Sequence, residues 1–232
     1  MKRANIAVIM AAGKGLRAGS PVPKQYMDLK GKMVLERAVE TFDNHPGIDQ
    51  VAIVVDPGEK NRVKEIVAGN SWKKVTRILE GGKQRFQSSQ AAIKAFADRS
   101  EDNMILHDAA RPLVSGRIID DVLEALKHYK AVGVAVPLTD TLFFTGPGND
   151  LIIRVPDRNF FQKAQTPQGF RIPLLVKAYK YASDDPGFSA TDDCGVVKRY
   201  LPKEKIFLVP GDEQNMKITY PGDLEILARW ID

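Results

Sequence analysis

Residues 6–26 read IAVIMAAGKGLRAGSPVPKQY, an apolar run that leads into a loop rich in glycine and cations. The run at residues 6–10 is typical of a buried parallel strand, so the loop is expected at the carboxyl end of a sheet strand, where open α/β sheets bind ligands. Exposed backbone N–H groups and fixed positive charge suit such a loop to a polyphosphate. The residues that supply them are Gly13, Gly15, Gly19, Arg17 and Lys24.

Other interpretations of this loop are weaker. The stretch GKGLRA at residues 13–18 matches the spacing of a dinucleotide-binding motif, and Glu36 lies near the position of its ribose-binding acid. That motif must open directly into a helix, whereas Pro21 and Pro23 stop a helix there. A Walker A loop is excluded because no Gly-Lys-Ser/Thr ending is present. A dehydrogenase with a nicotinamide cofactor therefore stays a minor alternative.

The composition fits one soluble α/β domain over residues 1–232. At 232 residues and 44% hydrophobic, the chain can bury a substantial core. It shows no signal-peptide pattern and no apolar stretch that would span a membrane, and Cys194 is the only cysteine, so we expect a cytoplasmic protein. The net charge of +5 favours anionic partners. Because the basic residues are scattered among acidic ones, we expect no nucleic-acid partner, and a nucleic-acid-binding module stays a minor alternative. The lack of a long apolar stretch predicts no membrane partner.

Short β-branched runs alternate with amphipathic segments up to residue 136, which predicts an α/β fold with a mostly parallel central sheet. The expected strands are Ala4–Met10, Gln50–Val55, Val75–Leu79, Asn103–His107 and Ala131–Val136. The expected helices are Met33–Asp43, Glu59–Ala68, Gln84–Ala97 and Gly116–Tyr129.

Residues 139–156 predict a protruding β-arm. Two apolar runs, Asp140–Thr145 and Leu151–Val155, flank the turn sequence GPGND at residues 146–150. An isolated hairpin is marginal in water, and this one is too apolar to stay solvated, so we expect it to pack on a second subunit and form a homodimer. The alternative is that the arm folds back on its own domain.

Polar clusters follow further strand ends. One cluster follows the predicted strand Val75–Leu79 and contains Gly82, Arg85 and Ser88. Backbone groups and the N-terminus of the next helix could bind a nucleotide there. Asp108 is the best candidate for a metal ion or a sugar hydroxyl, although spacing alone allows it to pair with Arg111 instead. His107 is interpreted as a core histidine, because no second histidine or cysteine stands at metal-ligand spacing.

Dispersed cations and hydroxyl groups complete the candidate site. The cations Arg17, Lys24, Arg158 and Lys217, with the hydroxyl groups of Thr166 and Thr191, suit a substrate that carries phosphates at several places.

These motifs together resemble the 2-C-methyl-D-erythritol 4-phosphate cytidylyltransferase family. The resemblance rests on the following motifs: AAGKGLRAG at residues 11–19 with PKQY at 23–26, GG at 81–82 with Arg85 and Ser88, DAARPL at 108–113, Asp140-Thr141, TPQ at 166–168, TDD at 191–193 and NMKIT at 215–219. It covers essentially the whole chain in order. It implies a Rossmann-like nucleotidyltransferase fold with a β-hairpin dimerisation arm, CTP as co-substrate, Mg²⁺ as cofactor, and a step of non-mevalonate isoprenoid synthesis. Ribitol 5-phosphate cytidylyltransferases share most of these motifs and remain the alternative.

The resemblance also implies roles for individual residues. Arg17 and Lys24 would stabilise the transferring phosphoryl group, while Arg158 and Lys217 would hold the acceptor phosphate. The nucleotide-binding residues would be Ala11, Ala12, Gly13, Gly15, Gly82, Arg85, Ser88 and Ala109. The acceptor-binding residues would be Asp108, Arg111, Thr141, Thr166 and Thr191. Mg²⁺ would be held mostly by substrate phosphates, with Asp108 as the candidate protein ligand.

Overall fold

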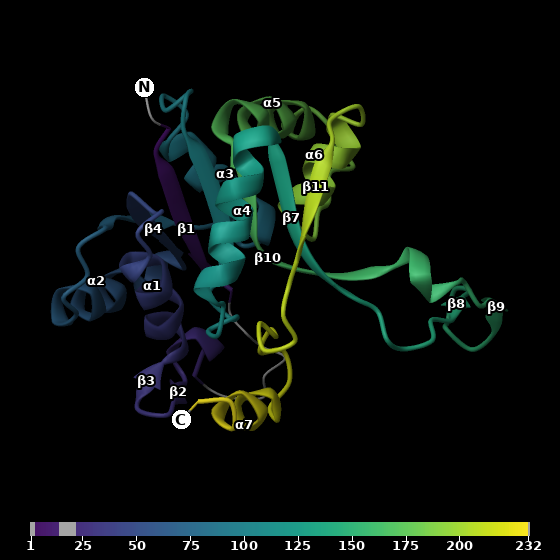
Figure 1. Ribbon diagram of the computed structural model, residues 1–232, viewed down its shortest axis with the longest axis horizontal. Helices are drawn as coiled ribbons and strands as arrows, with labels where there is room; N and C mark the ends of the chain where they lie inside the picture. Colours follow the sequence, from purple (N-terminus) through teal and green to yellow (C-terminus); the bar gives the residue numbers. More distant parts are fainter. Residues whose placement is uncertain (1–2, 14–21, 232) are drawn as a thin grey trace.

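The computed structural model describes residues 3–13 and 22–231, so Gly15 and Arg17 lie outside the described residues. Within them, a central sheet has seven strands in the order β11-β7-β10-β6-β1-β4-β5 (Figure 1). All neighbours pair in parallel except β10, which runs antiparallel to β6 and β7. The strands are β1 (Asn5–Ala11), β4 (Gln50–Val55), β5 (Val75–Glu80), β6 (Asn103–Asp108), β7 (Ala131–Pro137), β10 (Gln162–Arg171) and β11 (Ile206–Pro210).

Helices cover both faces of this sheet, because its strands carry apolar side chains on both sides. In β1, Ala7 and Ile9 pack toward one face, whereas Ile6 and Val8 pack toward the other. The first face packs against α1 (Val34–Asn44), α2 (Lys60–Gly69) and α4 (Gly116–His128). The second packs against α3 (Arg85–Ala95), α5 (Ile172–Ser183) and α6 (Asp193–Tyr200). The predicted α/β fold with a mostly parallel sheet is confirmed.

The five strands and four helices predicted up to residue 136 are present, with ends that differ by at most two residues. Strands β10 and β11 and helices α5 to α7 were not among the predicted elements. The sequence of β10, QKAQTPQGFR, is polar and contains Pro167, which argues against a central strand. Pro167 is accommodated because the register with β7 shifts between Gln165 and Gly169.

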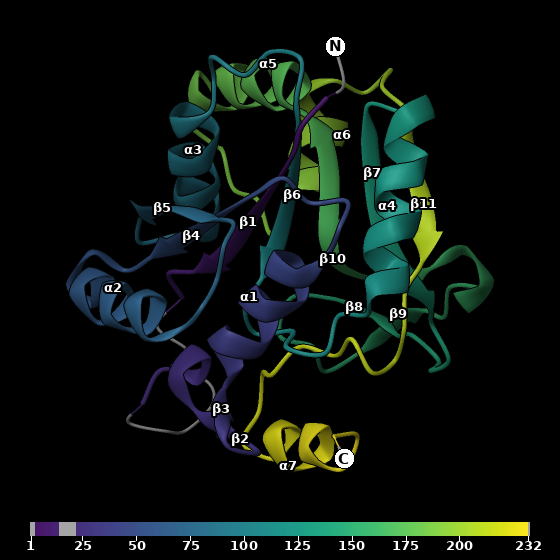
Figure 2. The same cartoon turned by 60° about the vertical axis from the view of Figure 1, so that its left-hand side comes forward.

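A small subdomain lies below the sheet (Figure 2). It consists of β2 (Asp28–Leu29), β3 (Lys32–Met33) and α7 (Asp223–Ala228), with the 3-10 turn η2 (Lys24–Tyr26) leading into it. Leu29 and Val34 pack there against Ile218 and Leu227. The two further 3-10 turns are η3 (Pro57–Glu59) and η4 (Arg158–Phe160). This packing brings the C-terminal part of the chain next to the segment that follows β1.

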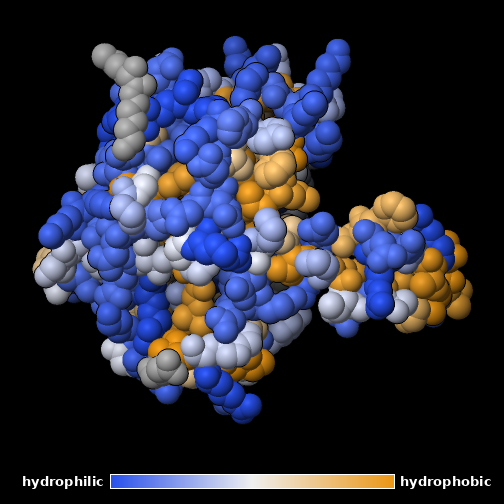
Figure 3. All heavy atoms as spheres, in the orientation of Figure 1, coloured by the Kyte–Doolittle hydropathy of each residue, from blue (hydrophilic) through white to orange (hydrophobic). Residues whose placement is uncertain are grey.

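The arm projects from the body of the protein instead of folding back on it, as Figure 1 shows. Its strands, β8 (Phe144–Thr145) and β9 (Ile152–Arg154), are shorter than the predicted ones, but they form the predicted antiparallel hairpin. The turn places Gly148 and Asn149 at φ values of +97° and +61°. Apolar side chains gather on the arm surface (Figure 3), and Leu151 is 76% exposed. The alternative in which the arm folds back is therefore wrong.

Within the described residues, every helix is too short or too polar to cross a membrane.

Replacing Gly169 with alanine is expected to destabilise the fold by about 1 to 3 kcal/mol, because overpacking a core carries that cost. A Cβ atom at this position of β10 would lie 2.7 Å from Val122 Cγ1 and 2.9 Å from Leu126 Cδ1, both on α4. The matched control is Gly69→Ala at the end of α2, where a Cβ atom would meet nothing within 4 Å. Denaturant unfolding should show a loss only for Gly169→Ala, and equal stabilities would contradict this account of the β10–α4 contact.

Candidate active site

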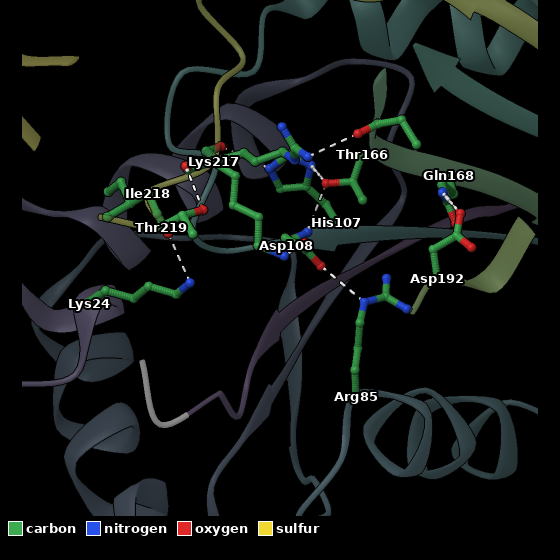
Figure 4. A network of polar contacts seen from close by, with 12 residues as sticks. Lys24, Arg85, His107, Asp108, Thr166, Gln168, Asp192, Lys217, Ile218 and Thr219 are labelled. Atoms are coloured by element: carbon green, nitrogen blue, oxygen red, sulfur yellow. Dashed lines mark hydrogen bonds and ion pairs between the residues drawn. The ribbon is translucent and has the colours of Figure 1, made fainter. Parts of the chain in front are cut away.

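The side chain of Asp108, the last residue of β6, lies at the centre of the candidate site (Figure 4). It is 10% exposed and pairs with two cations from distant parts of the chain. Lys217 Nζ lies 2.6 Å from one carboxylate oxygen, and Arg85 Nε lies 3.3 Å from the other. A buried charge needs such partners, and these hold β6, α3 and the C-terminal segment together.

The pKa values of the two buried partners follow from this arrangement. Burial alone would raise the pKa of Asp108, but Arg85 and Lys217 outweigh it and hold that pKa well below its usual range. Burial alone would lower the pKa of Arg85, but Asp193 and Asp108 outweigh it and raise that pKa. Asp108 therefore stays ionised at any working pH.

Arg85 is held by a second carboxylate that was not among the predicted site residues. Its Nη1 lies 2.6 Å from Asp193 Oδ2, and Asp193 is fully buried at the start of α6. Tyr179 Oη donates to the other oxygen of Asp193 at 2.6 Å. The TDD motif quoted above contains Asp193, but sequence alone could not show its pairing with a residue 108 positions away.

Residues 215–219 bring two of the predicted cations to the same place. Lys217 pairs with Asp108, and Lys24 Nζ donates to the backbone oxygen of Ile218 at 2.9 Å (Figure 4). The segment is fixed because Ile218 N donates to Ala110 O at 2.9 Å and Thr219 N donates to Asp223 at 2.6 Å. Lys24 and Lys217, nearly two hundred residues apart in sequence, thus lie beside one backbone segment.

The suggested pairing of Asp108 with Arg111 is wrong. Within residues 3–13 and 22–231, the ion pairs of Asp108 are with Arg85 and Lys217, and Arg111 donates to backbone oxygens of Asn215 (2.8 Å) and Ala164 (3.2 Å). Arg111 was expected to contact the acceptor, and its Nε is a buried N–H without a hydrogen-bond partner among the described residues. Arg85 Nη2 is likewise buried and has no hydrogen-bond partner among the described residues. Both groups are buried donors that are left unsatisfied among the described residues, which is uncommon in a protein interior.

Thr166 lies within the site, but its hydroxyl group faces the protein. The residue is 4% exposed, and Oγ1 lies 3.0 Å from the backbone nitrogen of Asp108 and 3.2 Å from His107 Nδ1. His107 is fully buried and stacks at a tilt against Phe42, as expected of a core histidine. Burial lowers the pKa of His107 to about 4, so the ring is neutral.

The start of the glycine-rich loop is anchored by Gln25, which was not predicted. Its Nε2 donates to Ala11 O at 2.9 Å and to Gly13 O at 3.0 Å, and the side chain is buried. The candidate nucleotide-binding residues Ala11, Ala12 and Gly13 therefore lie next to η2, which carries Lys24. Gln25 is part of the PKQY motif, which was its only sequence signal.

The other candidate nucleotide-binding residues lie close to this segment. Gly82 N donates to Ser88 Oγ at 3.2 Å, and Ala109 N donates to Met10 O at 3.1 Å. Adding a Cβ atom to Gly81 would place it 2.6 Å from Ala12 Cβ and from Ser88 Oγ. The ends of β1, β5 and β6 thus meet at one edge of the sheet, as predicted.

Three predicted residues are not drawn into this cluster. Thr141, Arg158 and Thr191 are exposed, and the side chain of Arg158 donates to the backbone oxygen of Thr139 across the base of the arm. Among the described residues, Arg158 forms no hydrogen bond or ion pair with Lys217 or Asp108. Their predicted roles therefore stay predictions.

Side chains alone do not supply a closed metal site. In the described part of the chain, no group of three His, Cys, Asp or Glu side chains is placed to hold an ion. Of the two carboxylates that pair with Arg85, Asp193 is fully buried and Asp108 is 10% exposed, and both oxygens of Asp108 are bonded to cations. Mg²⁺ commonly binds through one or two carboxylates together with substrate phosphates, and Asp108 fits that limited role.

The buried neutral His107 predicts a pH dependence of stability. Its pKa falls from 6.5 in the unfolded chain to about 4 in the folded one, so its contribution is complete above pH 6.5 and is lost as the pH falls toward 4. Relative to His107→Gln, the free energy of unfolding of the parent protein should fall by about 2 kcal/mol between pH 7 and pH 5. Urea unfolding of both proteins at both pH values measures this difference, since the two proteins differ only at residue 107. Parallel curves would contradict the neutral, buried state.

Comparison with known proteins agrees with this geometry. The sequence model of the 2-C-methyl-D-erythritol 4-phosphate cytidylyltransferase family matches residues 5–231. A protein of that name from Thermobifida fusca (strain YX) is 45% identical over 224 residues, which cover 95% of this chain and 90% of the relative. A bifunctional ribulose 5-phosphate reductase/CDP-ribitol pyrophosphorylase from Haemophilus influenzae is 39% identical over 226 residues, 97% of this chain and 48% of that protein.

A solved structure gives the same result for the fold. The crystal structure of 4-diphosphocytidyl-2C-methyl-D-erythritol synthase from Anaerococcus prevotii DSM 20548 superposes with a TM-score of 0.85 at 26% identity, covering 98% of this chain and 96% of that one. With its sheet, its arm and the motif residues gathered around Asp108, the chain belongs to the 2-C-methyl-D-erythritol 4-phosphate cytidylyltransferase family.

Proposed function

We propose that this chain transfers the cytidylyl group of CTP to 2-C-methyl-D-erythritol 4-phosphate, giving 4-diphosphocytidyl-2-C-methyl-D-erythritol and pyrophosphate. The observation that carries the proposal is the convergence of Lys24 and Lys217 on one backbone segment beside Asp108, at the edge of the sheet where the glycine-rich loop begins. The family match over residues 5–231 supports the choice of substrates.

The reaction needs positioning and charge stabilisation more than a protein base. A phosphate monoester has a second pKa of about 6, so near neutral pH its oxygen is already a nucleophile. That oxygen forms a bond to the α-phosphorus of CTP while the bond from this phosphorus to the bridging oxygen breaks, and pyrophosphate leaves. Lys24, with Arg17 from the loop, stabilises the charge on the phosphoryl oxygens. No proton transfer from His107 is required.

On the acceptor side, Lys217 holds the phosphate, and Asp108 and Arg111 orient the polyol. Lys217 is paired with Asp108 at 2.6 Å without substrate, so a phosphate dianion would compete with that carboxylate for the ammonium group. Arg111 lies in the turn after Asp108, and its guanidinium group donates to the backbone of Asn215, two residues before Lys217. Thr141 and Thr191 would help to bind the acceptor from the surface of the protein. The backbone at Thr166 would support the acceptor site from the interior.

We propose a homodimer in which the arm of one chain carries Arg158 to the site of the other. The projecting arm, with Leu151 at 76% and Phe160 at 85% exposure, would lose this apolar surface on a partner. Arg158 follows the arm and forms no hydrogen bond or ion pair with Lys217 or Asp108 of its own chain. An isologous dimer would bring each Arg158 to the opposite subunit.

Mg²⁺ is proposed as the cofactor, with Asp108 as the protein oxygen nearest to it. The ion, bound to the triphosphate, would reduce the repulsion between two polyanions. A cytoplasmic location and the lack of a nucleic-acid or membrane partner stay predictions.

Ribitol 5-phosphate is the second candidate acceptor. It is favoured by one observation, the 39% identity to the Haemophilus influenzae enzyme named a CDP-ribitol pyrophosphorylase, of which this chain spans about half the length. The two acceptors differ in the polyol that Asp108 and Arg111 would contact, and not in the chemistry at phosphorus.

The test is to incubate the protein with CTP and Mg²⁺ and either 2-C-methyl-D-erythritol 4-phosphate or ribitol 5-phosphate, and to measure pyrophosphate release. We expect a clear preference in kcat/KM for the first acceptor. A preference for ribitol 5-phosphate would overturn the proposed substrate, and no release with either acceptor would overturn the proposed function. As a control, Lys24→Ala should lower kcat by about 10², the effect of removing one donor to developing charge.

Arg158→Ala and Lys217→Ala, each nearly inactive by itself, are expected to regain activity when mixed. In a dimer that exchanges arms, one of the two sites of each heterodimer has both side chains intact, so random exchange would restore about a quarter of the sites. Pyrophosphate release after subunit exchange measures this recovery, and two Lys217→Ala preparations mixed together serve as the control. If heterodimers form without recovery, Arg158 and Lys217 do not meet across the interface.

A further inference from the structure

His107 lies one residue before Asp108, and both nitrogens of its ring are engaged. Nε2 lies 3.0 Å from the backbone oxygen of Arg111, and Nδ1 lies 3.2 Å from Thr166 Oγ1. A carbonyl oxygen only accepts, so Nε2 carries the hydrogen and Nδ1 accepts one from the Thr166 hydroxyl group. That hydroxyl oxygen accepts in turn from the backbone N–H of Asp108 at 3.0 Å. The ring therefore joins three backbone segments.

These segments carry the residues assigned above to the acceptor. Asp108 ends β6, Arg111 lies in the turn that follows, and Thr166 lies in β10. The same junction includes Asn215, whose Nδ2 donates to Thr166 O at 2.8 Å and whose backbone oxygen accepts from Arg111 Nη1 at 2.8 Å. Phe42 packs against the imidazole with ring centroids 5.0 Å apart.

We propose that His107 is a positioning residue for the acceptor: its ring fixes Thr166 and the backbone at Arg111, and through them the orientation of Asp108 and Arg111. This inference rests on the proposed function, because it assigns those two side chains to the acceptor. The ring is fully buried, and its two hydrogen bonds at 3.0 and 3.2 Å reach both segments directly.

Two substitutions separate the two hydrogen bonds. Asparagine places its side-chain oxygen near the position of Nδ1, so His107→Asn can still accept from Thr166 but loses the bond to Arg111. Glutamine places its amide nitrogen near the position of Nε2, so His107→Gln can still donate to Arg111 but leaves the Thr166 hydroxyl without its acceptor. Ile105→Val, two residues earlier on the same fully buried face of β6, is a control that changes packing without any polar contact.

The kinetic measurement compares the acceptor KM, kcat and the CTP dissociation constant. We expect each His107 variant to raise the acceptor KM about tenfold, the usual effect of a buried partner left unpaired, with CTP binding within about twofold of the parent. Ile105→Val should change neither. Two results would overturn the inference. One is a CTP dissociation constant that rises as much as the acceptor KM, and the other is an acceptor KM in the His107 variants that equals that of Ile105→Val.

A second measurement does not depend on activity. Hydrogen exchange at the backbone N–H of Asp108 should be about tenfold faster in His107→Gln, since its acceptor Thr166 is no longer oriented, and near the parent rate in His107→Asn and Ile105→Val. Unchanged protection in His107→Gln would overturn the inference even if the enzyme is active. A parent protein that releases no pyrophosphate with either acceptor, but shows the exchange pattern, would instead refute the proposed function.

Discussion

The buried carboxylate of Asp108 is the constraint on which the rest of the site depends. Removing a charge from water is costly unless it is paired, and here Lys217 and Arg85 supply the pairing at 2.6 and 3.3 Å. Because these cations come from the C-terminal segment and from α3, satisfying one carboxylate determines where two distant parts of the chain lie. The fully buried Asp193 fixes Arg85 from the other side.

This pairing also explains how the site holds cations close together before substrate arrives. Lys217 and Arg85 would repel each other without a counter-ion, and Asp108 provides one. In the proposed function, an entering phosphate would compete with this carboxylate for the ammonium group of Lys217. Ionisation of Asp108 is secure over the whole working range because its pKa is held well below normal by these same cations.

Much of the fold could be predicted from the sequence, because parallel strands buried on both faces appear as continuous β-branched runs. β10 could not, since its polar side chains are buried by partners that only the fold supplies. Gln168, for example, donates to Asp192 at 2.7 Å and accepts from the backbone of Asp193 at 3.1 Å. The same limit applies to the site. Spacing allowed Arg111 as a partner of Asp108, whereas the partners are Arg85 and Lys217, 23 and 109 residues away.

The arm shows what local sequence can and cannot determine. Glycine and asparagine in the turn are residues that adopt positive φ readily, and the structure has that turn at Gly148 and Asn149. The length of the two arm strands depends on what covers them. A two-stranded ribbon that packs on no second layer gains little stability from further strand pairing. β8 and β9 accordingly end after two and three residues, and their neighbours stay exposed. The proposed second subunit would cover these apolar side chains, so the arm and Arg158 belong to the same proposal of a dimer.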